Sequence, residues 1–312
     1  MTREVKIIEA ASENGAGRRG SSLGPSAVFL QAREQNLRFF EKRDWQMVEH
    51  FNDDITPGYR NPFAKNIESV VKSQENLCSA VENCLSDGYF PLILSGDHSN
   101  AIGGVSGVKN HYSDEKLGVI WIDAHMDLHS PYTTPSGNLH GMALNALLDL
   151  DNIESKRNDV SKGSLELWER LKKLGSHEIS PKVMPQHVVF LGPRDFEKEE
   201  KHLVEKNGIL HYGPAQIREL GIEEVLAETL KKLEACDVLY ISFDVDCLDT
   251  SISHGTGTPV DGGLKMTQAE YLVNALFHHP KVKAFEITEI NPLLDVENLM
   301  AKCVVKLLDN VL

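Results

Sequence analysis

The stretch that decides the fold is GVIWIDAHMD, residues 118–127, in which a run of apolar residues ends abruptly in a polar cluster. The residues Val119–Ile122 are apolar without interruption, which is typical of a parallel strand buried on both faces of a sheet. Asp123, His125 and Asp127 follow at every second position, so on an extended chain they can point the same way. The segment predicts a buried strand whose carboxyl end carries chemically active side chains.

Two further apolar runs end in the same manner. The run Val238–Phe243 is followed by Asp244 and Asp246, and the run Pro91–Leu94 leads through Asp97 to His98. Sheets of α/β proteins place their ligand sites at the carboxyl ends of their strands. We therefore expect the three clusters to converge, with Asp97 turned away from them as a cap or supporting partner.

The rest of the chain alternates short β-branched runs with stretches of helical periodicity. We predict strands at Val5–Ala10, Pro91–Ser95, Gly118–Asp123, His187–Gly192, Asp237–Asp244 and Val282–Glu289, and helices at Asn66–Ser86, Met142–Leu150, Ile222–Ala235, Gln268–His279 and Val296–Leu312. This order predicts an α/β protein with one mostly parallel sheet flanked by helices.

Nothing in the chain marks a domain boundary. There is no internal repeat, no low-complexity tract and no Pro/Gly/Ser-rich linker, so we predict one domain over residues 1–312. Residues 151–185 are less regular and carry a charged helix near Leu165–Leu174. We expect this segment to be a surface insertion.

Composition narrows the class of protein. The 312 residues are 41% hydrophobic and 25% charged, which is typical of a water-soluble globular protein. The net charge of −14 argues against nucleic acid or an anionic membrane as the main partner and is compatible with a cationic substrate. We expect no signal peptide, because residues 1–15 lack its basic stretch and apolar core, and no apolar run approaches the roughly 20 residues that span a bilayer. Five scattered cysteines do not suggest a disulfide scaffold, and we expect a cytoplasmic location, with Cys78 and Cys84 packed on a helix.

The residue types in the three clusters suit divalent metal ions. Four carboxylates in one cleft would carry a charge of −4, which two divalent cations would cancel. Imidazole and carboxylate ligands without thiolates suit Mn, Co, Fe, Ni or Zn. Two ions at roughly 3.5–4 Å could share a hydroxide, because coordination lowers the pKa of bound water to about 7. Each cluster alone is more often a turn, a cap or an ordinary loop histidine, but together they predict a metal pair held by His98, Asp123, His125, Asp127, Asp244 and Asp246.

At these residues the sequence resembles the ureohydrolases, the arginase family. The shared motifs are SGDHS at 95–99, DAHMD at 123–127, SGNLHGM at 136–142, SFDVDCLD at 242–249, GTGTP at 255–259 and EITEINP at 286–292, together with a glycine-rich loop at 9–25. The resemblance implies a three-layer αβα sandwich with a central, mostly parallel sheet, a fold shared with related deacetylases. It also implies two metal ions, commonly Mn²⁺ with Co²⁺ as an alternative, and a homo-oligomer, either trimer or hexamer.

The resemblance assigns a role to each matching residue. Asp123 and Asp244 would bridge both ions; His98 and Asp127 would complete one coordination shell, and His125 and Asp246 the other. Asp127 would also hydrogen-bond the bridging hydroxide. The match also makes His140 a proton shuttle, Glu289 the carboxylate that holds a guanidinium, and Thr258 part of the loop lining the same pocket.

Further matches favour L-arginine, hydrolysed to L-ornithine and urea. Ser136 and Asn138 match residues that contact the α-carboxylate, and Glu197 and Glu200 fall where two acids lie near the α-amino group. Alternatives are another ureohydrolase (agmatinase, guanidinobutyrase or formimidoylglutamase), a deacetylase, or a non-catalytic paralogue that acts as a binding subunit. The last typically loses metal ligands, whereas all six are present here.

Several positions depart from the family pattern. Ser95 replaces a usual Gly, Glu197 is one methylene longer than the usual Asp, and Cys247 replaces a common Gly. His129 stands where many arginases have an Asn that contacts the carboxylate, and residues 249–254 lack the usual proline. None of these changes removes a predicted metal ligand, but those at 95, 129 and 197 predict altered affinity or selectivity.

Overall fold

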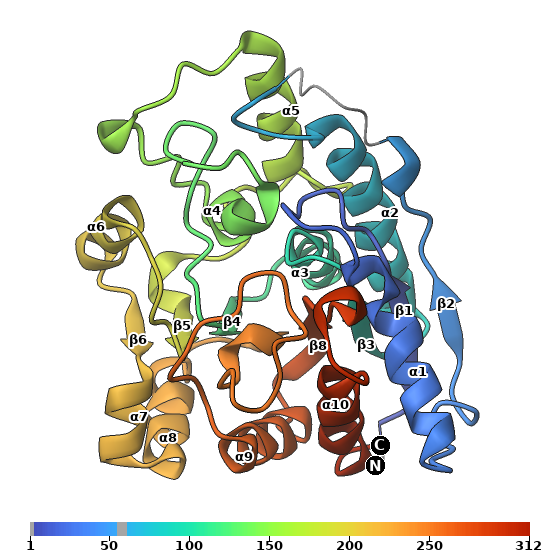
Figure 1. Ribbon diagram of the computed structural model, residues 1–312. Coiled ribbons are helices and arrows are strands. Elements are labelled where there is room, and N and C mark those ends of the chain that lie inside the picture. Colours follow the sequence, from blue (N-terminus) through green and yellow to red (C-terminus); the bar gives the residue numbers. More distant parts are fainter. Residues whose placement is uncertain (1–2, 55–60) are drawn as a thin grey trace.

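The strands of the protein form one parallel sheet. The computed structural model describes residues 3–54 and 61–312, and within these ranges eight strands lie in the order β2-β1-β3-β8-β7-β4-β5-β6, with every neighbouring pair parallel (Figure 1). The strands are β1 (Val5–Ala10), β2 (Trp45–Met47), β3 (Phe90–Ser95), β4 (Leu117–Ile122), β5 (Val188–Leu191), β6 (Leu210–Tyr212), β7 (Val238–Asp244) and β8 (Val282–Thr288). The four central strands β3, β8, β7 and β4 are therefore neighbours, although far apart in the chain.

Helices cover both faces of this sheet. On one face lie α1 (Gly24–Glu34), α7 (Pro214–Leu220), α8 (Ile222–Lys232), α9 (Met266–Phe277) and α10 (Leu299–Asp309), and on the other α2 (Ile67–Ser86), α3 (Asn100–His111), α4 (Ala143–Leu148), α5 (Lys162–Lys172) and α6 (Lys198–Asn207) (Figure 1). In the described ranges no helix combines the length and apolar character needed to cross a bilayer.

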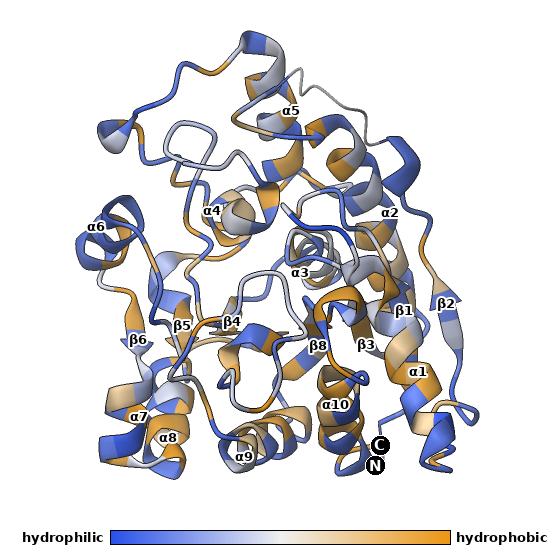
Figure 2. Cartoon of the chain, viewed as in Figure 1, coloured by the Kyte–Doolittle hydropathy of each residue, from blue (hydrophilic) through white to orange (hydrophobic). Residues whose placement is uncertain are grey.

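The apolar strands build two cores, one on each face of the sheet. Along β4 the side chains alternate, so that Val119 and Trp121 enter one core while Ile120 and Ile122 enter the other. Each fully buried aliphatic side chain stabilises the fold by about 1.5–3 kcal/mol relative to an exposed one. Figure 2 shows that the helices carry both apolar and polar segments, and their buried apolar residues belong to the two cores. The predicted three-layer architecture with helices on both faces of a parallel sheet is confirmed.

The predicted elements are present, with shifted ends, but several elements escaped prediction. All six predicted strands exist; the missed strands β2 and β6 are three residues long and lie at the two edges of the sheet. The helices α1, α3, α6 and α7 were also missed, and the helix expected from Val296 begins at Leu299. Cys78 and Cys84 are buried on α2, as predicted.

The missed helix α3 depends on glycines for its packing. A Cβ at Gly103 would lie 2.8 Å from the carbonyl oxygen of Gln74, and one at Gly107 would lie 2.6 Å from that of Cys78. Glycine disfavours an isolated helix, but here it lets α3 approach the backbone of α2 closely. Tertiary packing thus overrides the local preference.

Residues 151–185 are joined to the second core by α5. Trp168 and Leu171 are fully buried there, and Trp168 Nε1 donates a hydrogen bond to Asp151 Oδ1 at 2.7 Å. Lys172, also buried, forms ion pairs with Asp149 and Asp151. We propose that the chain is a single domain carrying this segment as a surface insertion, because both cores share one sheet.

Replacing Trp168 by Ala should therefore destabilise the whole protein. Loss of a buried tryptophan costs about 3–5 kcal/mol, whereas Glu166→Ala, at an exposed position of the same helix, should change stability by no more than about 0.5 kcal/mol. Denaturant unfolding followed by circular dichroism measures both. If the two variants unfolded at the same midpoint, α5 would not be part of the core.

Candidate active site

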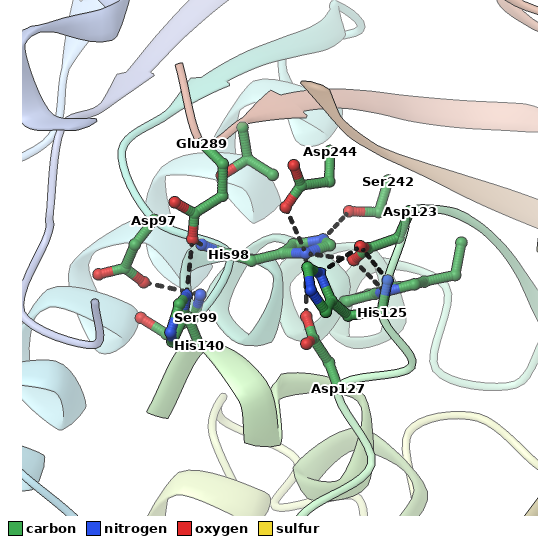
Figure 3. Close-up of polar contacts among 12 residues, drawn as sticks. Asp97, His98, Ser99, Asp123, His125, Asp127, His140, Ser242, Asp244 and Glu289 are labelled. Atoms are coloured by element: carbon green, nitrogen blue, oxygen red, sulfur yellow. Dashed lines mark hydrogen bonds and ion pairs between the residues drawn. The ribbon is translucent and has the colours of Figure 1, made fainter. Parts of the chain in front are cut away.

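Six polar side chains converge at the carboxyl edge of the sheet. They come from the carboxyl ends of β3, β4 and β7 and from the loops that follow, and these strands lie in the sheet with only β8 between β3 and β7. They are His98, Asp123, His125, Asp127, Asp244 and Asp246, five of which are shown together in Figure 3. The structure thus brings together all six residues that the sequence predicted as metal ligands.

The six side chains form two connected groups. His98 Nδ1 lies 3.0 Å from Asp123 Oδ2, 3.0 Å from Asp127 Oδ2 and 3.2 Å from Asp244 Oδ2. His125 Nδ1 lies 3.4 Å from Asp123 Oδ1 and 3.1 Å from Asp246 Oδ2. Asp123 belongs to both groups, one oxygen to each, so the arrangement offers two adjacent places for a cation.

The backbone conformation that brings these residues together differs from the predicted one. β4 ends at Ile122, and Asp127 has φ +52°, so the segment after Asp123 is a turning loop instead of an extended strand with alternating faces. Glu289, directly after β8, likewise has φ +66°. Left-handed backbone at a residue other than glycine costs about 1–3 kcal/mol and persists where the surrounding structure holds it in place.

Without cations, the charges of the cluster oppose one another. Burial, together with neighbouring carboxylates, raises the pKa of Asp127, Asp244 and Asp246. Burial also opposes the ionisation of Asp123, but hydrogen bonds with His125 and His98 outweigh it and lower its pKa. A nearby positive charge would let all four carboxylates ionise.

The surroundings of His98 fit a metal ion. Ser242 Oγ donates to Glu286 Oε2 at 3.1 Å and lies 2.7 Å from His98 Nε2, so it accepts the Nε2 proton of a neutral imidazole. His98 Nδ1 is then a buried lone pair without a hydrogen bond, although three carboxylate oxygens lie within 3.2 Å. A cation between the lone pair and those oxygens satisfies both, and the donor set is one that Mn or Co accepts.

Supporting residues that the sequence did not reveal hold these ligands in place. Trp121 stacks on the His98 ring with centroids 4.1 Å apart, and its Nε1 donates to Asp123 Oδ2 at 3.0 Å. Glu286 is fully buried and also accepts hydrogen bonds from Ser95 at 2.6 Å and Tyr240 at 2.9 Å. Such partners orient metal ligands and fix histidine tautomers.

Asp97 points away from the ligands, as expected, and secures the glycine-rich loop. One of its oxygens accepts hydrogen bonds from the backbone N–H groups of Gly15 at 2.7 Å and Ala16 at 3.1 Å, and the other accepts from that of Ser99 at 2.8 Å. Burial raises the pKa of Asp97 to about 6. The loop is thereby held against the rim of the site.

His140 and Glu289 form a second reactive pair beside the cluster (Figure 3). His140 Nδ1 donates to Glu289 Oε1 at 2.9 Å, and the same oxygen accepts the backbone N–H of His98 at 3.0 Å. Burial opposes protonation of His140, but the hydrogen bond and charge of Glu289 outweigh it and raise the pKa to about 9. Thr258 Oγ1 donates to Asp246 Oδ2 at 3.1 Å, which ties the 255–259 loop to the cluster.

The remaining predicted substrate residues line the outer part of the site. A cavity of about 240 Å³ is lined by five of the six metal-ligand residues, all but Asp123, by His140 and Thr258, and by His129, Ser136, Glu197 and Glu200. Asn138 lines an adjoining cavity of about 540 Å³ together with Arg18, His140 and Glu289.

Asp195 lines both cavities, with Oδ2 3.9 Å from His125 Nε2. The N-cap residue of α6 is Glu197, whose backbone N–H donates to Glu200 Oε2 at 3.0 Å.

The architecture and the site can be compared with known proteins. The model of the arginase family matches residues 3–312. The arginase of Bacillus subtilis (strain 168) is 33% identical over 100% of this chain and 98% of its own length. The chain belongs to the arginase family.

Solved structures of arginases share its fold. That of Bacillus caldovelox arginase has a TM-score of 0.85 at 33% identity, covering 100% of this chain and 98% of the other. That of Entamoeba histolytica arginase in complex with L-ornithine has a TM-score of 0.83 at 25% identity, covering 99% of both chains. As an arginase-family protein the chain is a metal-dependent hydrolase of the ureohydrolase type, a family whose members use a dinuclear metal site.

The His140–Glu289 pair can be tested by titration. In protein freed of metal by chelation, the His140 ring should titrate near pH 9, and Glu289→Gln should lower that midpoint, because it removes the negative charge that stabilises the imidazolium. NMR of the histidine rings, assigned with a His140→Gln variant, measures both. A wild-type midpoint at or below the ordinary histidine value of about 6.5 would contradict the pairing.

Proposed function

We propose that this arginase-family protein hydrolyses L-arginine to L-ornithine and urea. The observation that carries the proposal is a single cavity lined by five of the six cluster residues, all but Asp123, and by His129, Ser136, Glu197 and Glu200. Polar and charged groups suited to an amino acid's α-carboxylate and α-amino group thus share one cavity with the metal-ligand cluster. The ornithine-bound arginase of Entamoeba histolytica supports the same substrate class.

The six ligands would hold two divalent cations. Asp123 and Asp244 would contact both ions, with His98 and Asp127 completing one set and His125 and Asp246 the other. The ions supply Lewis acidity and lower the pKa of coordinated water to about 7. We propose Mn²⁺ as the metal, with Co²⁺ as the alternative, since both accept imidazole and carboxylate.

The protein's own residues orient the substrate and move protons. The Glu289 carboxylate, whose pKa is lowered because hydrogen bonds from His140 and the His98 backbone outweigh burial, is an anion suited to a guanidinium. Breaking the bond between the guanidinium carbon and the ornithine nitrogen requires a proton on the departing amine. His140 is placed to supply it, because Glu289 keeps its Nδ1–H bound and leaves Nε2 to exchange a proton. Asp127 would accept a hydrogen bond from the attacking water.

Other ureohydrolase substrates lack either the free α-carboxylate or the free α-amino group of arginine. Agmatine retains the amine without the carboxylate, and the α-desamino analogue of arginine retains the carboxylate without the amine. If the outer residues recognise the α-carboxylate, kcat/KM for arginine should exceed that for agmatine by about tenfold or more. Urea release with each compound, in manganese and in cobalt, measures this, and agmatine as the preferred substrate would overturn the assignment to arginine.

Removing a shared ligand should abolish both metal binding and turnover. Asp123→Asn keeps the side-chain volume but removes the charge facing both histidines. Elemental analysis should show fewer bound ions per chain than the wild type, and urea release should fall about a hundredfold or more, beyond what the loss of a supporting residue costs. Asp114→Asn, an exposed acid, serves as the control. Full turnover by Asp123→Asn would contradict the mechanism.

A further inference from the structure

His129 forms a hydrogen bond with Glu197, an acidic residue that lines the same cavity. Its Nε2 lies 3.0 Å from Glu197 Oε2 and 3.6 Å from Glu200 Oε2, and the His129 ring is buried while Glu197 is half exposed. The imidazole therefore links the loop after β4 to Glu197, the N-cap residue of α6. The amino end of a substrate would lie in this part of the cavity.

The hydrogen bonds around the ring show which nitrogen carries the proton. Thr133 Oγ1 accepts the backbone N–H of Ser130 at 3.1 Å and lies 3.1 Å from His129 Nδ1. The Thr133 hydroxyl proton is thus free to point at Nδ1 of a neutral ring, which puts the ring proton on Nε2, facing Glu197. A protonated ring also has a proton there. In both states His129 donates to Glu197.

Glu200 offers no free alternative. Its Oε1 accepts the backbone N–H of Leu128 at 3.0 Å, and its Oε2 accepts that of Glu197 at 3.0 Å. Each oxygen of Glu200 thus already accepts one backbone hydrogen bond, from the loop after β4 or from the start of α6. A positively charged amino group that contacts Glu197 would share its Oε2 with the imidazole of His129.

We propose that His129 is a specificity-determining residue: it competes with the substrate's α-ammonium for Glu197 and so weakens the preference for arginine over a guanidino acid that lacks the α-amino group. This inference rests on the proposed function, because it concerns the same cavity. It assigns the chain a substrate range that extends to guanidino acids carrying only a terminal carboxylate.

Two substitutions separate the hydrogen bond to Glu197 from the rest of the side chain. The Asn amide nitrogen takes roughly the place of imidazole Nδ1 and cannot reach Glu197, whereas the Gln amide nitrogen reaches roughly the place of Nε2 and can. In the manganese-loaded protein, His129→Asn should raise the kcat/KM ratio of arginine to its α-desamino analogue about tenfold, the worth of one charge-assisted hydrogen bond. The change should lie in KM. His129→Gln should keep the wild-type ratio within about twofold.

A control variant and two contradicting outcomes complete the comparison of the His129 variants. His211→Asn, at an exposed position on β6, should leave the ratio unchanged. An unchanged or lower ratio in His129→Asn, or a His129→Gln variant that behaves like His129→Asn, would overturn the role of His129.

Binding keeps this inference separate from the proposed reaction. Calorimetry of the manganese-loaded wild type and His129→Asn with L-ornithine and with its α-desamino analogue gives a Kd ratio that needs no turnover. Tighter relative binding of ornithine by the variant supports competition at Glu197, and an unchanged Kd ratio overturns it. Failure of the wild type to release urea from any guanidino compound would count against the proposed function alone.

Discussion

The central constraint on the structure is the repulsion among four buried carboxylates that the sheet holds close together. Asp123, Asp127, Asp244 and Asp246 are buried at one edge, and two histidines lie within 3.4 Å of their oxygens. Burial makes each negative charge unfavourable, and proximity makes each raise the pKa of the next. Four carboxylates carry more charge than the two histidines can balance, so the arrangement is suited to binding cations.

Rigid surroundings hold the cluster against that repulsion. The ligands follow strands whose side chains are fully buried on both faces, and His98 is fixed from behind by Ser242 and by the stacked Trp121. Behind Ser242, the buried Glu286 accepts hydrogen bonds from three hydroxyl groups, so its own carboxylate is satisfied. The left-handed backbone at Asp127 and Glu289 is strain of the kind that such an over-determined setting can maintain.

The sequence predicted what depends on uninterrupted burial, and missed what depends on contacts between distant segments. Buried strands such as β4 and β7 are visible as apolar runs, and the residues that directly follow them were correctly brought together. The edge strands β2 and β6 are too short to show periodicity, and the glycines of α3 hide a helix whose stability comes from α2. The partners Ser242, Trp121 and Glu286 lie within strands, where a polar or aromatic residue gives no sign that its side chain reaches a ligand. The loop after β4 shows the same limit, since alternation along an extended chain suggested the right residues through a conformation that the chain does not adopt.

The metal ligands and the outer residues of the site lie on different segments of the chain. Residues that affect the reaction are therefore separate from residues that affect substrate selectivity. The inner ligands sit on strand ends within two continuous cores, where a change in one side chain disturbs its neighbours. The outer residues belong to the loop after β4 and to the first turn of α6, and Glu197 is half exposed. Exchanges there, such as a histidine at position 129 or a longer acid at position 197, can alter which amino end is accepted without moving a metal ligand. The hydrogen bond between His129 and Glu197 is such an exchange, because it uses an oxygen of the outer cavity and touches neither His98 nor His125.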